Sequence, residues 1–383
     1  MKNEIVKLIF QQLCPNQRLS LVAAGDVPPK YRFLAISVAG RLRWVAPYSC
    51  KLGLPTLRQW TPYGSLSWIK WKILLKLYRV GLLGYLPGVQ SFGISGLHSA
   101  VWSHLNWNYS TPPAILIYIG TPSVTSKAVV TLAYQDTGYP TTIIKIPLGL
   151  KAIVSIAQEA RALRSLENHK YKLAPKLLYH DTNLGFSLQE AINGSFVTIR
   201  LTEHHYNFLG KLINWTSFST LAEFAVLLLN RLDQLNSMPS AEYFILNCAL
   251  QKIKDNTPIA TGWLHGDFAP WNLKWDESKK LMAVDWEFAE PYAPVGIDLI
   301  HYLCRVNGIM GYSVDKAKLF QSNIIDSIKE INSGLFPLHE EFLKQFFHYY
   351  LIWYQISLEE HGIIDPVRLF YYHIIREVSN EPL

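Results

Sequence analysis

The change from strand-like to helical patterns near residue 198 is the feature that most constrains the fold. Between residues 114 and 192, five short runs rich in β-branched and aromatic residues are typical of strands, and residues 151–169 have helical spacing. From residue 198 onward, helical patterns dominate. A small sheet with one helix, followed by a helical body, predicts an α+β fold of two lobes.

Residues 1–112 form a basic, aromatic N-terminal extension ahead of this sheet. They carry 13 Lys or Arg and only two acidic residues, a net charge of +11, whereas the whole chain carries +7. Such a surface can meet an anionic membrane, a nucleic acid or an anionic substrate, or it can be an ordinary basic surface. Because no nucleic-acid motif accompanies the charge, nucleic acid is not an expected partner. Peripheral membrane contact through residues 1–112 stays open.

Residues 65–83 of this extension have the spacing of one helix. At about 100° per residue, Lys72, Lys76 and Arg79 fall on one narrow strip, while Lys70 stands apart and most of the remaining surface is apolar. We expect a helix that is buried on most sides, with a thin solvent edge. The alternative is a helix that lies on a membrane with its basic residues at the headgroups.

The cysteine content and the hydropathy of the chain indicate its cellular compartment. The four cysteines are far apart and form no CxxC pair, so we expect neither a zinc site nor a disulfide framework, and a reducing compartment fits. No apolar run reaches the roughly 18 residues of a membrane span, and the first residues do not resemble a signal peptide. We expect a cytoplasmic protein, with peripheral attachment to the inner membrane face as a further option.

The stretch WLHGDFAPWNL, residues 263–273, places polar side chains in apolar surroundings. A tight loop would bring Asp267 and Asn272 to one cleft, and the hairpin that follows would return Asp285 beside Asn272. An amide oxygen and a carboxylate are hard oxygen ligands that suit Mg²⁺, which leaves Asp267 to accept a proton. The structural alternative is a turn in which Asp267 caps the chain and His265 is satisfied in the core.

The segments HGDFAPWN and VDWEFAEPYAPVGIDL together resemble the aminoglycoside phosphotransferase and choline kinase-like family. The resemblance implies a protein-kinase-like fold, with a small β-rich N-lobe over residues 113–192 and a helical C-lobe over residues 193–383. It implies that ATP phosphorylates a small-molecule hydroxyl. The implied roles are these: Asp267 is catalytic, Asn272 and Asp285 hold Mg²⁺, Asp298 braces the catalytic loop, and His265 is structural.

The upstream half supplies the remaining parts that a kinase requires. In the kinase arrangement, a Lys on the third strand holds the α/β-phosphates and pairs with a Glu on the next helix. Lys145 and Glu159 occupy those positions, although a surface ion pair of little energetic value is the alternative. Gln189, Glu190 and Ala191 resemble the hinge between lobes, whose backbone would bond adenine.

Two loops complete this prediction. Thr121, Ser123 and Ser126 are candidates to approach phosphate, in a loop poor in glycine. Gly266 stands where protein kinases generally carry an Arg that binds an activation-loop phosphate, and the chain from Asp285 to Asp298 is short. We therefore expect a kinase that needs no activating phosphorylation.

The acceptor is less clearly encoded than the phosphate donor. We expect nucleotide and a small-molecule hydroxyl acceptor as partners, with a sugar or another polar alcohol as first choice. Choline, ethanolamine or an aminoglycoside comes next, because Glu287 and Glu290 could receive an ammonium group beside aromatic residues. A nucleotide-binding pseudokinase that acts as a scaffold is the alternative class.

Overall fold

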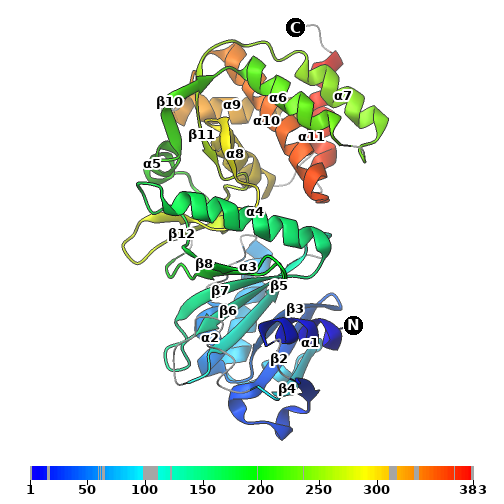
Figure 1. Cartoon of the computed structure of the whole chain (residues 1–383), viewed down its shortest axis with the longest axis vertical. Coiled ribbons are helices and arrows are strands. Elements are labelled where there is room, and N and C mark those ends of the chain that lie inside the picture. Colours follow the sequence, from blue (N-terminus) through cyan, green and yellow to red (C-terminus); the bar gives the residue numbers. More distant parts are fainter. Residues whose placement is uncertain are drawn as a thin grey trace. The chain divides into compact units, whose positions relative to one another are not determined.

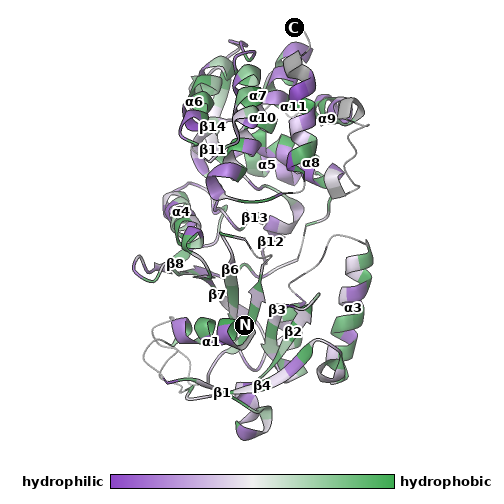
Figure 2. Cartoon of the chain, turned by 90° about the vertical axis from the view of Figure 1, so that its right-hand side faces the viewer, coloured by the Kyte–Doolittle hydropathy of each residue, from purple (hydrophilic) through white to green (hydrophobic). Residues whose placement is uncertain are grey.

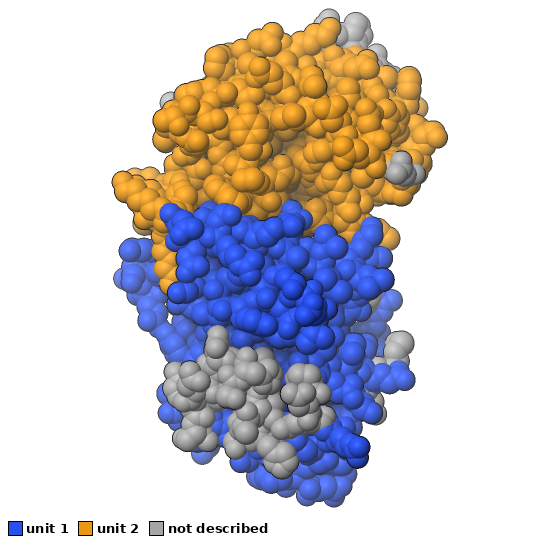
Figure 3. Space-filling model, viewed as in Figure 1, with its two compact units in different colours: residues 1–168, 174–196, 274–282 blue, residues 169–173, 197–273, 283–383 orange. Residues whose placement is uncertain are grey.

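The computed structural model describes residues 2–14, 18–58, 60, 62, 65–97, 111–120, 123–195, 197–235, 237–309, 317–331, 336–365 and 367–380. The chain forms two compact units (Figure 3). Unit 1 comprises residues 1–168, 174–196 and 274–282, and unit 2 comprises residues 169–173, 197–273 and 283–383. Unit 1 is rich in strands and unit 2 in helices, so the predicted α+β fold is confirmed.

Unit 1 is built on one nine-stranded sheet whose neighbouring strands all run antiparallel, in the order β1-β4-β2-β3-β5-β6-β7-β9-β8 (Figure 1). The strands are β1 (Ser20–Val22), β2 (Arg32–Val38), β3 (Arg41–Pro47), β4 (Val89–Ser95), β5 (Ala114–Ile119), β6 (Lys127–Ala133), β7 (Pro140–Pro147), β8 (Leu177–His180) and β9 (Ser187–Glu190). The pairing of Trp44 with Tyr118 joins β3 to β5. Strands from residues 1–112 therefore continue the same sheet as those from residues 113–192.

Helices cover both faces of this sheet. They are α1 (Lys2–Leu13), α2 (Cys50–Leu57), α3 (Ser65–Arg79) and α4 (Leu150–Glu167), with short 3-10 turns η1 (Ala24–Asp26), η2 (Pro29–Tyr31) and η3 (Leu83–Tyr85). Because side chains alternate along a strand, Phe33 and Ala35 pack with α1 on one face, while Leu34 and Ile36 pack with α2 and α3 on the other. The long Ala- and Leu-rich helix α4 carries Glu159.

Unit 2 is mainly helical. A three-stranded sheet in the order β10-β11-β14 combines β10 (Ile213–Ser219), β11 (Ile259–Leu264) and β14 (Glu290–Pro294). The helices are α5 (Glu203–Gly210), α6 (Leu221–Asp233), α7 (Ser240–Leu250), α8 (Ile297–Ile309), α9 (Ala317–Ile331), α10 (Glu340–His361) and α11 (Arg368–Asn380). The turn η5 (Pro270–Asn272) precedes β12 (Leu273–Trp275), which pairs with β13 (Leu281–Ala283) in a two-stranded sheet that belongs mostly to unit 1.

The expectation for α3 was wrong. Instead of a helix buried on most sides, α3 leaves most of its surface in solvent, and Leu66 and Ile73 are 73% and 54% exposed. Periodicity predicted the helix but not which of its apolar residues would meet the sheet.

Within the described residues, no helix combines the length and the apolar character needed to cross a bilayer.

Candidate active site

A buried ion pair lies in unit 1 between β7 and α4. The Nζ of Lys145 is 2.7 Å from Oε1 of Glu159, and the two side chains are 6% and 0% exposed. Two charges removed from water are usually replaceable by apolar residues without loss of stability. The structure pairs these two predicted residues. Because both side chains are buried, the pair is not the exposed ion pair of the alternative interpretation.

The predicted hinge segment, residues 189–191, lies at the end of strand β9. Gln189 pairs with Ile143 of β7, while the amide of Glu190 donates to the carbonyl of Lys176 over 2.8 Å and that of Ala191 to the carbonyl of Thr141 over 3.0 Å. These two amides are thus engaged within unit 1. In a backbone hydrogen bond with adenine, Glu190 or Ala191 would therefore accept through its carbonyl oxygen.

The candidate phosphate loop closes on itself. The amide of Ser123 donates to Oγ of Ser126 over 2.5 Å, and the amide of Ser126 donates to the carbonyl of Ser123 over 3.1 Å. This tight turn precedes β6 and fixes the two hydroxyl groups relative to each other. Thr121, the third residue predicted for this loop, lies outside the described residues.

The HGD loop in unit 2 begins where β11 ends, and Asp298 at the start of α8 holds it. Oδ2 of Asp298 accepts from the amide of His265 over 2.8 Å, and Oδ1 accepts from the amide of Gly266 over 3.0 Å. Burial raises the pKa of Asp298 to about 7, although both amides oppose that rise. Asp298 thus contacts the loop in the way expected of a brace.

His265 and Gly266 shape the turn of this loop. Burial lowers the pKa of His265 to about 4, so its ring is neutral at pH 7; Nε2 donates to the carbonyl of Val284 over 3.0 Å and Nδ1 accepts from the amide of Asp267 over 3.2 Å. Gly266 has a φ of +83°, and a Cβ there would lie 2.5 Å from Cβ of Phe288. No larger side chain fits at position 266 without strain, so the conformation itself calls for glycine.

Asp267 and Asn272 meet directly. The turn η5 folds the Asn272 amide back, so that its Nδ2 donates to Oδ2 of Asp267 over 2.7 Å and to the backbone carbonyl of Asp267 over 2.9 Å. Because both contacts use the amide nitrogen, the amide oxygen is the atom of Asn272 that suits a cation. The predicted closure of this loop is therefore present in the structure.

Asp285 follows β13 in a left-handed conformation, with a φ of 69°. The amide of Val284 donates to the carbonyl of Asn272 over 2.9 Å, which places the residue before Asp285 against Asn272. A non-glycine residue in this region is strained, and such strain gathers at functional sites. The hairpin thus returns the chain near Asp285 to Asn272, as predicted.

Amide and carboxylate oxygens, such as those of Asn272 and Asp285, are hard ligands of the kind that Mg²⁺ prefers. Among the described residues, no group of three or more His, Cys, Asp or Glu side chains could hold a metal ion. Mg²⁺ is commonly bound by one or two protein oxygens together with substrate phosphates and water. Asn272 and Asp285 each carry an oxygen of this kind.

The sequence analysis missed His301, a buried residue on α8 that contacts the predicted catalytic carboxylate. Its Nε2 lies 3.0 Å from Oδ1 of Asp267, and its Nδ1 lies 3.2 Å from the hydroxyl of Tyr350. Burial alone would raise the pKa of Asp267, but the hydrogen bond from His301 and the positive charge of Arg305 more than offset it, so this pKa lies below its usual value. The spacing of Asp298, His301 and Arg305 on one helix was the available signal.

Arg305 and Glu290 belong to further ionic groups of unit 2. Arg305 donates to Asp365 over 2.7 Å, and its guanidinium lies 5.4 Å from the ring of Trp271. Glu290 accepts from Arg231 over 2.9 Å and from the indole of Trp353 over 3.0 Å. Because Glu290 already has a cationic partner, its suggested role as receptor for an acceptor ammonium is not favoured.

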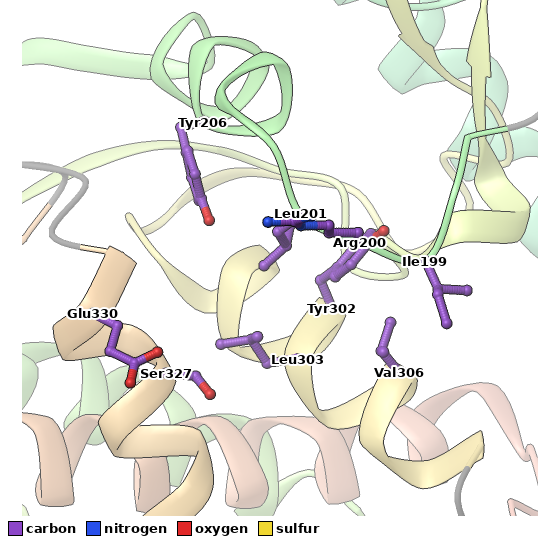
Figure 4. Close-up of a pocket in the computed structure, with 9 residues that line it drawn as sticks. All are labelled: Ile199, Arg200, Leu201, Tyr206, Tyr302, Leu303, Val306, Ser327 and Glu330. Carbon is purple, nitrogen blue, oxygen red and sulfur yellow. The ribbon is translucent and has the colours of Figure 1, made fainter.

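A cavity of about 420 Å³ lies in unit 2 beside α8 (Figure 4). Tyr302, the neighbour of His301, lines it, and Figure 4 shows Ser327 and Glu330 of α9 across from Tyr206. The complete lining is Ile199, Arg200, Leu201, Tyr206, Tyr302, Leu303, Val306, Ser327 and Glu330. Aromatic and apolar walls with a few polar groups are typical of small-molecule sites.

Comparison with known proteins agrees with the motifs. Residues 126–310 match the model of the phosphotransferase enzyme family (APH). The resemblance to aminoglycoside phosphotransferases and choline kinases predicted from HGDFAPWN is confirmed. No curated protein matches the chain.

Three solved structures illustrate this likeness. The ADP-bound aminoglycoside phosphotransferase APH(2'')-Ib is 13% identical, with 74% of this chain and 97% of that chain covered and a TM-score of 0.40. A macrolide 2'-phosphotransferase type I is 11% identical, with 75% and 99% covered and a TM-score of 0.43. The choline kinase LicA from Streptococcus pneumoniae is 14% identical, with 66% and 87% covered and a TM-score of 0.37.

Proposed function

We propose that this chain is an ATP-dependent kinase that phosphorylates a hydroxyl group of a small molecule. The observation that carries the proposal is the carboxylate of Asp267, which accepts from Asn272 and lies within hydrogen-bond distance of His301, in a loop that Asp298 braces. A carboxylate with a lowered pKa stays ionised at neutral pH and can accept a proton from an alcohol. The family match over residues 126–310 agrees with this chemistry.

Each residue of the proposed site would have its own role in phosphoryl transfer. Lys145, held by Glu159, would bind the α/β-phosphates of the nucleotide. Asn272 and Asp285 would hold Mg²⁺, which when bound neutralises charge on the β- and γ-phosphates. Asp267 would orient the acceptor hydroxyl toward the γ-phosphate and receive its proton as the oxygen attacks. Catalysis of this kind rests mainly on positioning and electrostatics.

For the acceptor, we favour a sugar or another polar alcohol with an apolar face. The cavity beside α8 offers tyrosine rings for such a face, and Arg200, Ser327 and Glu330 for hydroxyl groups. Choline is less favoured, because Arg231 already neutralises Glu290. Aminoglycosides remain a second candidate, since Glu330 could pair with an ammonium group.

The test is ATP consumption by the purified chain across sugars, amino alcohols, choline and aminoglycosides, with Asp267→Asn as the matched variant. We expect turnover with at least one alcohol, loss of most of that turnover in Asp267→Asn, and unchanged nucleotide affinity, because the variant keeps the size of the side chain and removes the base. Nucleotide binding without turnover on any acceptor would favour the scaffold alternative. Equal turnover in the variant would show that Asp267 is not the base.

A further inference from the structure

Helix α3 packs on unit 1 through one side only. Trp71, Leu74 and Leu75 are partly buried against the cluster that contains Trp44. Tyr78 on the same side is 1% exposed, and its hydroxyl donates to a backbone carbonyl at the end of β3. These contacts fix the rotation of the helix, and so determine which residues face away from the sheet.

The outward side of α3 carries an apolar strip. At about 100° per residue, Leu66, Ile69, Ile73 and Val80 fall within a narrow sector opposite Tyr78. Ile69 and Val80 are 48% and 59% exposed. Exposed apolar side chains that line up in this way mark contact surfaces far more often than scattered ones do.

Basic residues flank this strip on both sides. Lys72, Lys76 and Arg79 lie along one edge and Lys70 along the other, and Nζ of Lys72 is 5.1 Å from the ring of Trp68, which is 46% exposed. From Val27 to Gln135 the sequence contains no acidic residue. The strip is therefore bordered by four basic residues and by no acidic residue of α3, and Figure 2 shows hydrophobic and hydrophilic residues interleaved along α3.

We propose that the outward face of α3 binds an anionic lipid bilayer, with the helix axis parallel to the membrane. The apolar strip would enter the boundary between headgroups and acyl chains, the lysines would reach the anionic headgroups, and Trp68 would lie at the interface. A nucleic acid would match the charge but would leave the apolar strip exposed to water. A second protein chain of matching acidic and apolar character is the competing occupant.

The experiment is co-sedimentation of the full chain with vesicles of phosphatidylcholine, with and without phosphatidylglycerol. We expect binding to the anionic vesicles and weak binding to the neutral ones. Lys72→Gln with Lys76→Gln should weaken binding about thirtyfold, since each lysine near an anionic surface contributes a factor of about five. Raising the salt concentration should reduce this electrostatic part.

Two further variants separate the proposal from a general effect of charge. Ile69→Ser with Ile73→Ser keeps every charge and should also weaken binding, because the apolar strip is lost. Lys254→Gln with Lys280→Gln removes two exposed lysines outside α3 and should bind as the wild type does. Circular dichroism checks that each variant is folded.

Three results would overturn the proposal. One is equal binding to neutral and anionic vesicles, and another is unaltered binding in both α3 variants. The third is an absence of vesicle binding together with self-association that the Ile69→Ser, Ile73→Ser variant abolishes, which would assign the face to a second copy of the chain. None of these results depends on whether the chain transfers phosphate.

Discussion

His301 offers a direct test of how unit 2 holds its carboxylate. The side chain is fully buried, and burial keeps its pKa below the usual value despite the hydrogen bond to Asp267. The ring is therefore neutral at pH 7, so that the hydroxyl of Tyr350 donates to Nδ1 and Nε2–H donates to Asp267. His301→Leu would remove one of the two side-chain donors to this carboxylate and leave the other, Asn272, in place.

The size of the effect follows from that single contact. A hydrogen bond to a charged group contributes roughly 1.5–3 kcal/mol. If the bond fixes the carboxylate in the transition state, kcat should fall about ten- to a hundredfold, with the KM for ATP nearly unchanged. His301→Gln, whose amide can still donate, should recover part of the loss.

The pH profile gives a second readout that a purely structural role would not move. Burial tends to raise the pKa of Asp267, and His301 supplies much of what lowers it. Without His301 this pKa rises, and because the base is lost as pH falls through its pKa, the acid limb of kcat should move to higher pH. Unchanged kcat and an unchanged acid limb, with only a lower melting temperature, would refute the positioning role.

Two other buried groups make separate predictions. Asp298→Asn leaves one buried amide of the HGD loop without an acceptor and should lower the free energy of unfolding by roughly 1–3 kcal/mol. Because the pKa of Asp298 is raised to about 7, the wild type should lose stability as pH rises from about 4 to 7, and the variant should lose less. Urea unfolding at several pH values would show this difference. Lys145→Met with Glu159→Leu should keep or raise the melting temperature while nucleotide affinity falls, and a clear loss of stability would contradict this.

Sequence alone predicted the parts that local patterns encode. The β-branched run at residues 141–147 and the helical spacing after it placed Lys145 on a strand and Glu159 on a helix, and the structure pairs the two. The turn residues Gly266 and Pro270 predicted that the chain would close between Asp267 and Asn272, as it does. In each case the interacting residues are few positions apart or belong to adjacent elements.

The rest depended on contacts between distant segments. The pairing of Trp44 with Tyr118 crosses 74 positions of sequence, and no local pattern in β3 specifies which edge it will meet. The orientation of α3 was undetermined for the same reason, because apolar residues occur on both sides of that helix. His301 escaped notice since its partner, Asp267, lies 34 positions away, and a lone histidine on an apolar helix is more often a core residue.

Three unfavourable features lie in the segments proposed to bind nucleotide and acceptor. The Lys145–Glu159 pair removes two charges from water, Asp285 has a left-handed backbone, and Asp298 carries a carboxyl group whose ionisation burial disfavours. Replacing a buried ion pair with apolar residues is often neutral or stabilising. The buried Lys145–Glu159 pair therefore argues for a chain that uses these charges, because the pair itself carries a desolvation cost.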